Sequence, residues 1–228
     1  MSGPTRVERL HVPGQGFGLG GIVAGTAAFR AAMKGHFAAS VAPDGPDRLY
    51  VSRSRLGADK GALIDEDRLE MLLAQQGYDI FHPQAHDLTT QVARYKAATT
   101  ILASEGSALH LVGMTARADQ VIGIIARRRS PATEMIRTHL HSFSGRAPVV
   151  FDALRRNWKP AGQPRKHMWQ GELDFPLLQA MLRQEGFLTP GGASWPQRSL
   201  EQVAALLGRD FVVAKRYRRD DPLRHAAE

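Results

Sequence analysis

Short apolar runs alternate with helical segments between Leu49 and Arg127, and this alternation constrains the fold more than any other feature of the chain. The apolar runs are rich in β-favouring residues, and the segments between them carry apolar residues at helical spacing. Short alternating units of this kind build a parallel sheet with helices on both faces. The predicted strands are residues 49–52, 78–81, 99–103 and 121–125, and the predicted helices are residues 65–77, 89–98 and one that opens at 104–107.

The composition is that of a globular protein. The chain has 228 residues, of which 43% are hydrophobic and 23% are charged. That length suffices for one core of roughly 150 residues and an attachment. Charged residues and glycine interrupt every apolar run before the ~20 residues of a membrane span, and the sequence starts with no charged-then-apolar export signal. Because there is also no cysteine, we expect a cytoplasmic protein without disulfides or thiolate chemistry.

The net charge of +8 invites an anionic partner. The basic residues fall into three separate clusters, residues 127–129, 155–166 and 215–219, and such clusters are typical of solvated surface. The sequence has no nucleic-acid-binding motif, and only 7% of its residues are aromatic, so we expect no specific nucleic acid partner. Peripheral association with anionic lipid, at the inner face of the membrane, stays open.

The parts on either side of the alternating region differ from it. Residues 1–48 contain a glycine-rich passage, 14–21, in which Gly16, Gly18 and Gly21 match the GxGxxG dinucleotide fingerprint. The strand that should precede this motif, Val7 to Val12, is weak, and no acidic residue follows at the expected spacing, so a loop is favoured. Residues 131–228 contain scattered prolines, which indicate an extended linker, and two helical patterns at 175–184 and 200–207. We therefore expect three regions, 1–48, 49–130 and 131–228.

The alternating region has the chemistry of a phosphate site. Arg53, Arg55 and Lys60 follow the first predicted strand, and Gly106 and Ser107 lie where the third predicted strand meets a helix. Helix-start amides and basic side chains at one sheet edge would stabilise a departing diphosphate. The alternative is that the arginines are solvated loop residues and that Ser107 only begins a helix.

Five segments in this order resemble the catalytic-domain pattern of glycosyltransferase family 61. They are Tyr50-Val51-Ser52-Arg53, Ile64-Asp65-Glu66, Gly77-Tyr78, Leu88 with Gln91, and Ala103-Ser104-Glu105-Gly106-Ser107-Ala108-Leu109. The resemblance covers about residues 45 to 128. It implies a Rossmann-like, GT-B type inverting transferase that uses a nucleotide-activated sugar, and it places the family's functional residues on Arg53, Glu66, Gln91 and Gly106.

The chain departs from that pattern in three respects. Asp65 stands where the family usually has Asn, and Glu105 stands where it often has His. A carboxylate beside a diphosphate repels it unless the carboxylate is protonated or paired. Transferases of this architecture bind the acceptor in an N-terminal domain, and 48 residues are too few to build one. We therefore expect a donor-binding core at 49–130 preceded by a remnant of an acceptor domain.

Three further groups of residues have a plain interpretation beside a functional one. Asp65-Glu66-Asp67 matches a metal-binding Asp-x-Asp, but acids at a helix start offset the helix dipole, so we expect no metal and no cofactor. The histidine pairs, at positions 139 and 141 and at 82 and 86, are interpreted as surface residues rather than zinc ligands. The tryptophans at 158, 169 and 195 are expected to pack on the core, with an acceptor wall or partner surface as the alternative.

The sequence as a whole predicts an inverting glycosyltransferase of polysaccharide or glycoconjugate synthesis. It would move a sugar from a nucleotide-sugar donor to a hydroxyl of a glycan or lipid-linked acceptor. The donor-binding candidates are Arg53, Arg55, Lys60, Gln91, Gly106 and Ser107, and the candidates for general base are Glu66 and Glu105. The alternatives are a non-catalytic nucleotide-sugar-binding or scaffold protein and a basic nucleic-acid-binding protein.

Overall fold

A five-stranded parallel sheet forms the centre of the molecule. The computed structural model describes residues 3–4, 6–57, 60–162 and 165–217. The strand order is β2-β1-β3-β4-β5, with all neighbours parallel. The strands are β1 (Arg48–Val51), β2 (Asp79–Phe81), β3 (Thr100–Ser104), β4 (Val121–Ile125) and β5 (Val149–Phe151).

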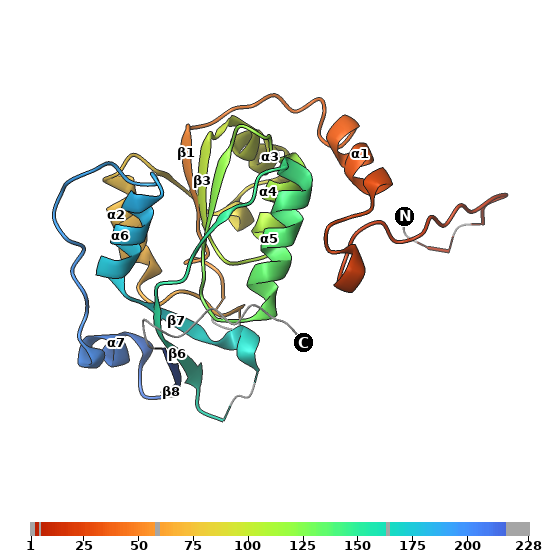
Figure 1. Ribbon diagram of the computed structural model, residues 1–228. Coiled ribbons are helices and arrows are strands. Elements are labelled where there is room, and N and C mark those ends of the chain that lie inside the picture. Colours follow the sequence, from red (N-terminus) through yellow and green to blue (C-terminus); the bar gives the residue numbers. More distant parts are fainter. Residues whose placement is uncertain (1–2, 5, 58–59, 163–164, 218–228) are drawn as a thin grey trace.

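Helices cover both faces of this sheet (Figure 1). On one face lie α2 (Glu66–Ala74) and α6 (Phe175–Gln184), and on the other lie α3 (Leu88–Ala97), α4 (Ala108–Thr115) and α5 (Pro131–Ser144). Alternate strand residues point to opposite faces. Leu49 and Val51 therefore pack in the core under α3, α4 and α5, whereas Tyr50 packs in the core under α2 and α6.

The predicted α/β class is confirmed, and so are most of the predicted elements. All four predicted strands occur within one residue of their expected bounds. The three predicted helices of the alternating region correspond to α2, α3 and α4. The two C-terminal helical patterns are α6 and α7 (Leu200–Leu207).

The interpretation of the segment after Ile125 as an extended linker is wrong. Pro131 is the first residue of the 14-residue helix α5, a position where the missing N–H has no intrahelical role and the fixed φ favours the helix. Pro148 directly precedes β5, which extends the sheet beyond residue 130, and Pro160 ends β6. Pro164 lies outside the described residues, as do positions 218 and 219 of the third basic cluster.

A small antiparallel sheet lies against the carboxyl ends of the parallel strands. Its strands β6 (Leu154–Pro160), β7 (Gln170–Leu173) and β8 (Phe211–Arg216) have the order β7-β6-β8. The backbone of Gly171 joins it to the loop before α2: Ile64 N donates to Gly171 O at 2.8 Å, and Gly171 N donates to Ala62 O at 2.8 Å. The small sheet therefore closes one side of the edge at which ligands bind parallel sheets.

The N-terminal part contains one α-helix, α1 (Ala27–Gly35), which packs against α4. In the described residues before it there is no strand, only the short 3₁₀ turn η1 (Gly20–Ile22). The loop interpretation of the glycine-rich passage is thus confirmed. Across the described ranges, no helix has the length and apolar character to cross a membrane.

Candidate functional site

The sheet has a topological switch point between β1 and β3, because the chain leaves β1 toward β2 on one side and later places β3 on the other. Ligands of doubly wound sheets bind in the crevice outside the carboxyl ends at this point. A cavity of about 350 Å³ lies there, and we call it the basic cavity. Its polar lining consists of Arg53, Glu105, Gly106, Ser107, His110, Arg127 and Arg128.

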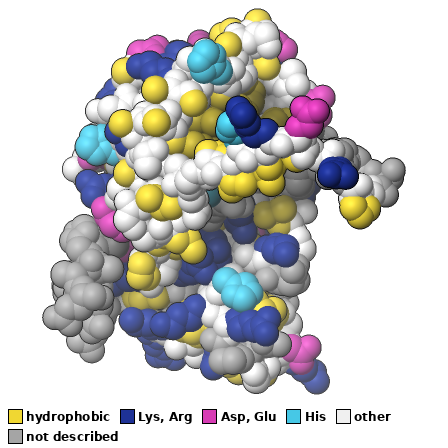
Figure 2. Space-filling view, turned by 90° about the vertical axis from the view of Figure 1, so that its right-hand side faces the viewer, with side chains coloured by type: hydrophobic (Ala, Val, Ile, Leu, Met, Phe, Trp, Pro, Cys, Tyr) yellow, Lys and Arg dark blue, Asp and Glu magenta, His cyan; other side chains and the backbone are white. Residues whose placement is uncertain are grey.

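Arg and Lys side chains gather around this part of the surface. On the face shown in Figure 2, they occupy the recess between the body of the parallel sheet and the small sheet below it. Of the charged residues that line the basic cavity, three are arginines and one is a glutamate. Two net positive charges therefore face the cavity.

Arg53 leaves β1 and lies across the turn that follows β3. Its side chain is almost fully buried, and Nη2 donates to the backbone oxygens of Lys60 at 3.2 Å and Gly61 at 3.4 Å. A Cβ atom on Gly106 would lie 2.4 Å from Arg53 Nη1. A side chain at position 106 would therefore displace the Arg53 guanidinium from this main chain, and the structure brings these two predicted residues together.

Arg127 and Arg128 belong to this site, although their cluster was expected to be solvated. That expectation is wrong: Arg127 is 4% exposed and donates from Nε to Glu105 O at 3.1 Å. Burial lowers the pKa of Arg127 to about 10, so the side chain stays cationic at neutral pH. The sequence signal was its position directly after a buried parallel strand, where side chains reach the carboxyl edge.

Glu105 lies in the cavity wall but does not present an unpaired charge. Arg128 Nε is 3.2 Å from its Oε1, and Thr133 Oγ1 donates to its Oε2 at 2.9 Å. The carboxylate is only 1% exposed. Because this carboxylate is paired with Arg128, it does not repel a diphosphate as an unpaired carboxylate would. The ion pair also holds Arg128 at the cavity.

Glu66 lies behind the cavity rather than in its wall. Its Oε1 accepts hydrogen bonds from Tyr50 Oη at 2.8 Å and from the backbone N of Arg53 at 3.1 Å. The side chain is 3% exposed, and burial raises its pKa. Glu66 thus holds the turn that carries Arg53. Its predicted role as a base stays a prediction.

The other predicted donor residues lie apart from this group, with one exception. Ser107 directly precedes α4 and lines the cavity. Gln91 donates to the backbone oxygens of Pro83 and His86 at 2.9 and 3.0 Å, which orders the loop after β2. Arg55 is exposed and lines a neighbouring cavity, and Lys60 is exposed. Their donor-binding roles stay predictions.

Two walls of the basic cavity come from segments that were not expected to contribute. The first two turns of α5 supply Ala132, Met135 and Ile136, and the glycine-rich loop and the short turn at its end supply Gly18, Leu19 and Val23. Phe17 anchors this loop by packing its ring 4.7 Å from the ring of His139. The amino ends of α4 and α5 both face the cavity, and helix amino ends favour anions.

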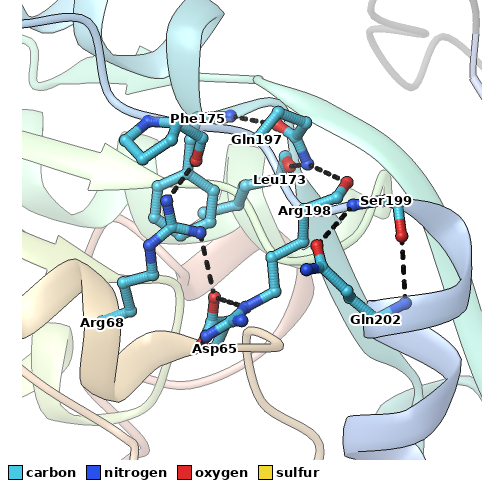
Figure 3. Close-up of polar contacts among 9 residues, drawn as sticks. Asp65, Arg68, Leu173, Phe175, Gln197, Arg198, Ser199 and Gln202 are labelled. Atoms are coloured by element: carbon cyan, nitrogen blue, oxygen red, sulfur yellow. Dashed lines mark hydrogen bonds and ion pairs between the residues drawn. The ribbon is translucent and has the colours of Figure 1, made fainter.

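Asp65 has a structural role at the start of α2 (Figure 3). Its backbone is left-handed, with φ of 64°, and its side chain accepts hydrogen bonds from Arg198 and Arg68 rather than capping the helix. Asn and Asp are the non-glycine residues that adopt this conformation most readily. This explains why Asp can replace the Asn of the resembled pattern. Within the described ranges, no three His, Cys, Asp or Glu residues converge as a metal site would require.

The histidine and tryptophan expectations had mixed outcomes. His139 and His82 are buried, at 0% and 6% exposure, so their interpretation as surface residues is wrong. His139 shares a 3.0 Å hydrogen bond with the backbone oxygen of His110. Trp158 and Trp195 are buried in apolar clusters, which confirms packing.

The fold and the site define a doubly wound α/β protein with a cationic cavity at the switch point of its sheet. The model of the family Glycosyltransferase 61 matches residues 4–122, just over half of the 228-residue chain. The chain therefore belongs to glycosyltransferase family 61, and its activity is that of a glycosyltransferase in general terms. A comparison with curated proteins gives no match.

Proposed function

We propose that this protein transfers a sugar, with inversion, from a nucleoside-diphosphate donor bound in the basic cavity to a hydroxyl of a glycan or lipid-linked acceptor. The proposal rests on two buried arginines whose side chains are not paired with a carboxylate among the described residues. Arg53 and Arg127 are 8% and 4% exposed, and their hydrogen bonds go to backbone oxygens. Among the described residues, neither guanidinium forms an ion pair with a carboxylate.

Burying a guanidinium without an anionic partner is unfavourable by several kcal/mol. A bound diphosphate would supply the missing charge, and the amino ends of α4 and α5 would add their partial positive charge. These groups act most strongly when the diphosphate leaves, because its negative charge then increases. In this scheme Arg53 and Arg127 bind the phosphates, Arg128 is held in place by Glu105, and Glu66 positions Arg53.

The proposal has three further parts. The parallel sheet would be the donor-binding half of a GT-B type transferase. Leaving-group stabilisation would come from arginines, so no divalent cation is required. Synthesis of a polysaccharide or glycoconjugate is the setting in which such a transfer is used.

The test is a thermal-shift titration of the whole chain with UDP, GDP, CDP and ADP, in excess EDTA. We expect at least one of them to raise the unfolding temperature, since a ligand at 100 times its Kd adds about 2.7 kcal/mol. Arg53→Ala and Arg127→Ala should each weaken its affinity by about 1.5 to 3 kcal/mol, the range of a charge-assisted hydrogen bond.

The matched control is Arg209→Ala, which removes the same charge from an exposed position that lines neither this cavity nor its neighbour. Its affinity should equal that of the wild type. Equal losses in all three variants would mean that only net charge matters and would overturn the site. Binding that appears only with added Mg²⁺ or Mn²⁺ would overturn metal independence.

A further inference from the structure

A second cavity opens at the carboxyl ends of β1 and β2, on the other side of the turn that follows β1. It has a volume of about 410 Å³, within the range of small-ligand sites. Its polar lining comes from Arg55, Asp67, Glu70, His82 and His86. Arg53 faces the basic cavity and Arg55 faces this one. The two cavities are therefore separated by a single turn of chain.

Glu70 is held in this second cavity by one of its two carboxylate oxygens. Its Oε1 accepts hydrogen bonds from Ser52 Oγ at 2.5 Å and Ser54 Oγ at 2.6 Å, and it lies 3.8 Å from His82 Nε2. Within the part of the chain that the structure describes, Oε2 has no hydrogen-bond partner, and Glu70 lines the cavity. Burial lowers the pKa of His82, so its ring is neutral at neutral pH. Glu70 is thus oriented by neutral groups and has an oxygen left to accept a proton.

The other carboxylates near this edge are engaged differently. Arginine side chains bind Asp65, Glu105, Asp152 and Glu172, and an ion-paired carboxylate is a weaker base. Glu66 accepts its hydrogen bonds inside the protein and is 3% exposed. Glu70 is the half-buried carboxylate in this group that combines fixed geometry with an accessible oxygen, which general-base catalysis requires.

We propose that the second cavity binds the acceptor sugar and that Glu70 is the general base of the transfer, an inference that rests on the proposed function. Carboxylate, imidazole and guanidinium groups all hydrogen bond to sugar hydroxyls, and Met71, which is 61% exposed, offers an apolar surface to a sugar ring. The acceptor hydroxyl gives its proton to Glu70 Oε2 while its oxygen bonds to the anomeric carbon. The bond from that carbon to the diphosphate oxygen breaks, and its electron pair leaves with the nucleoside diphosphate.

The first test measures acceptor binding without turnover. Saturation-transfer difference NMR on the whole chain, with a panel of methyl glycosides and the best nucleoside diphosphate present, should show contact with at least one glycoside. Ala85→Trp, which fills the second cavity, should abolish that contact. Ala118→Trp, at another exposed alanine that lines a different cavity, should not. Absence of any contact in the wild type, or contact that survives Ala85→Trp, overturns the acceptor site.

The second test measures catalysis. Glu70→Gln keeps the shape and the hydroxyl contacts of the side chain but removes its basicity. Release of nucleoside diphosphate from the matching nucleotide sugar, with the bound glycoside as acceptor, should fall at least 100-fold, as for loss of a general base. Nucleoside diphosphate affinity should stay within twofold of the wild type. Glu201→Gln makes the same change at an exposed glutamate that lines neither cavity, and it should keep the activity of the wild type.

The outcomes separate this inference from the proposed function. A Glu70→Gln variant as active as the wild type overturns Glu70 as the base. If nucleoside diphosphates do not stabilise the wild type, the proposed donor site fails. The glycoside measurement, repeated without nucleotide, still decides whether the second cavity holds a sugar.

Discussion

At the scale of a single residue, the backbone conformation of Asp65 explains a departure from the resembled motif that the residue type alone does not explain. The Asp-Glu pair matches the order of the resembled Asn-Glu pair, and the structure explains the exchange by a left-handed backbone at position 65. The same residue also bridges the start of α2 to the segment before α7 through Arg198. Neither the conformation nor the partner, 133 positions away, is visible in the local sequence.

Two substitutions at Asp65 separate these contributions. Asp65→Ala loses both the carboxylate and the tolerance of the left-handed conformation, and it should lower the free energy of unfolding by about 2 kcal/mol. Asp65→Asn keeps that tolerance and an acceptor oxygen, so we expect a loss about 1 kcal/mol smaller. Urea titration of both variants measures the difference. Asp67→Ala, an exposed acid in the same turn, is the control, and equal losses for Ala and Asn at position 65 would contradict the conformational argument.

At the scale of elements, apolar spacing with clear end signals predicted α6 and α7, whereas α5 was missed. Asp174 caps α6 by accepting from Leu177 N, and Ser199 and Gln202 form a capping box at the start of α7. The buried face of α5 instead includes His139 and Ser144 beside its apolar residues. A buried polar side chain breaks the apolar periodicity on which helix prediction rests.

His139 also gives the α4–α5 pair a dependence on pH. Burial lowers the pKa of His139 to about 4, below the ordinary 6.5, so the unfolded chain binds a proton there that the folded chain does not. Stability should therefore be fully present above pH 6.5 and fall as the pH drops toward 4, by up to about 3 kcal/mol. Burial lowers the pKa of His110 as well, which acts in the same direction.

The check is the unfolding free energy of the wild type, His139→Gln and His141→Gln between pH 7 and pH 4. In His139→Gln, the free energy of unfolding should fall less from pH 7 to pH 4 than it does in the wild type. In His141→Gln, which changes an exposed residue on the same helix, it should fall as in the wild type. Parallel curves for all three proteins would show that His139 does not carry the effect.

At the scale of the whole molecule, the parallel sheet with its flanking helices could be anticipated from the sequence, but not the segments that complete the site. Arg53 and Gly106 were predicted because both follow strands of the alternating region. The glycine-rich loop and the start of α5 reach the same cavity through tertiary packing, which no local pattern reports. The family match is also incomplete: residues 4–122 contain β1 to β3 and the first two residues of β4, but neither β5 nor α6, which lies on the same face of the sheet as α2.

The C-terminal region should therefore be indispensable for folding. Leu178, Phe187 and Trp195 pack in one apolar cluster with Tyr50 and Leu69 of the parallel-sheet region. Deleting residues 156–228 would expose the face of the sheet that this cluster covers, and we expect insoluble protein without a cooperative unfolding transition. A graded version replaces one side chain at a time. Leu178→Ala should cost about 2 to 5 kcal/mol because the residue is fully buried, and Leu206→Ala, 53% exposed on α7, should cost less than about 0.5 kcal/mol. A soluble deletion variant that unfolds cooperatively would show that the core closes without α6, and the region would then be free to serve as an acceptor wall.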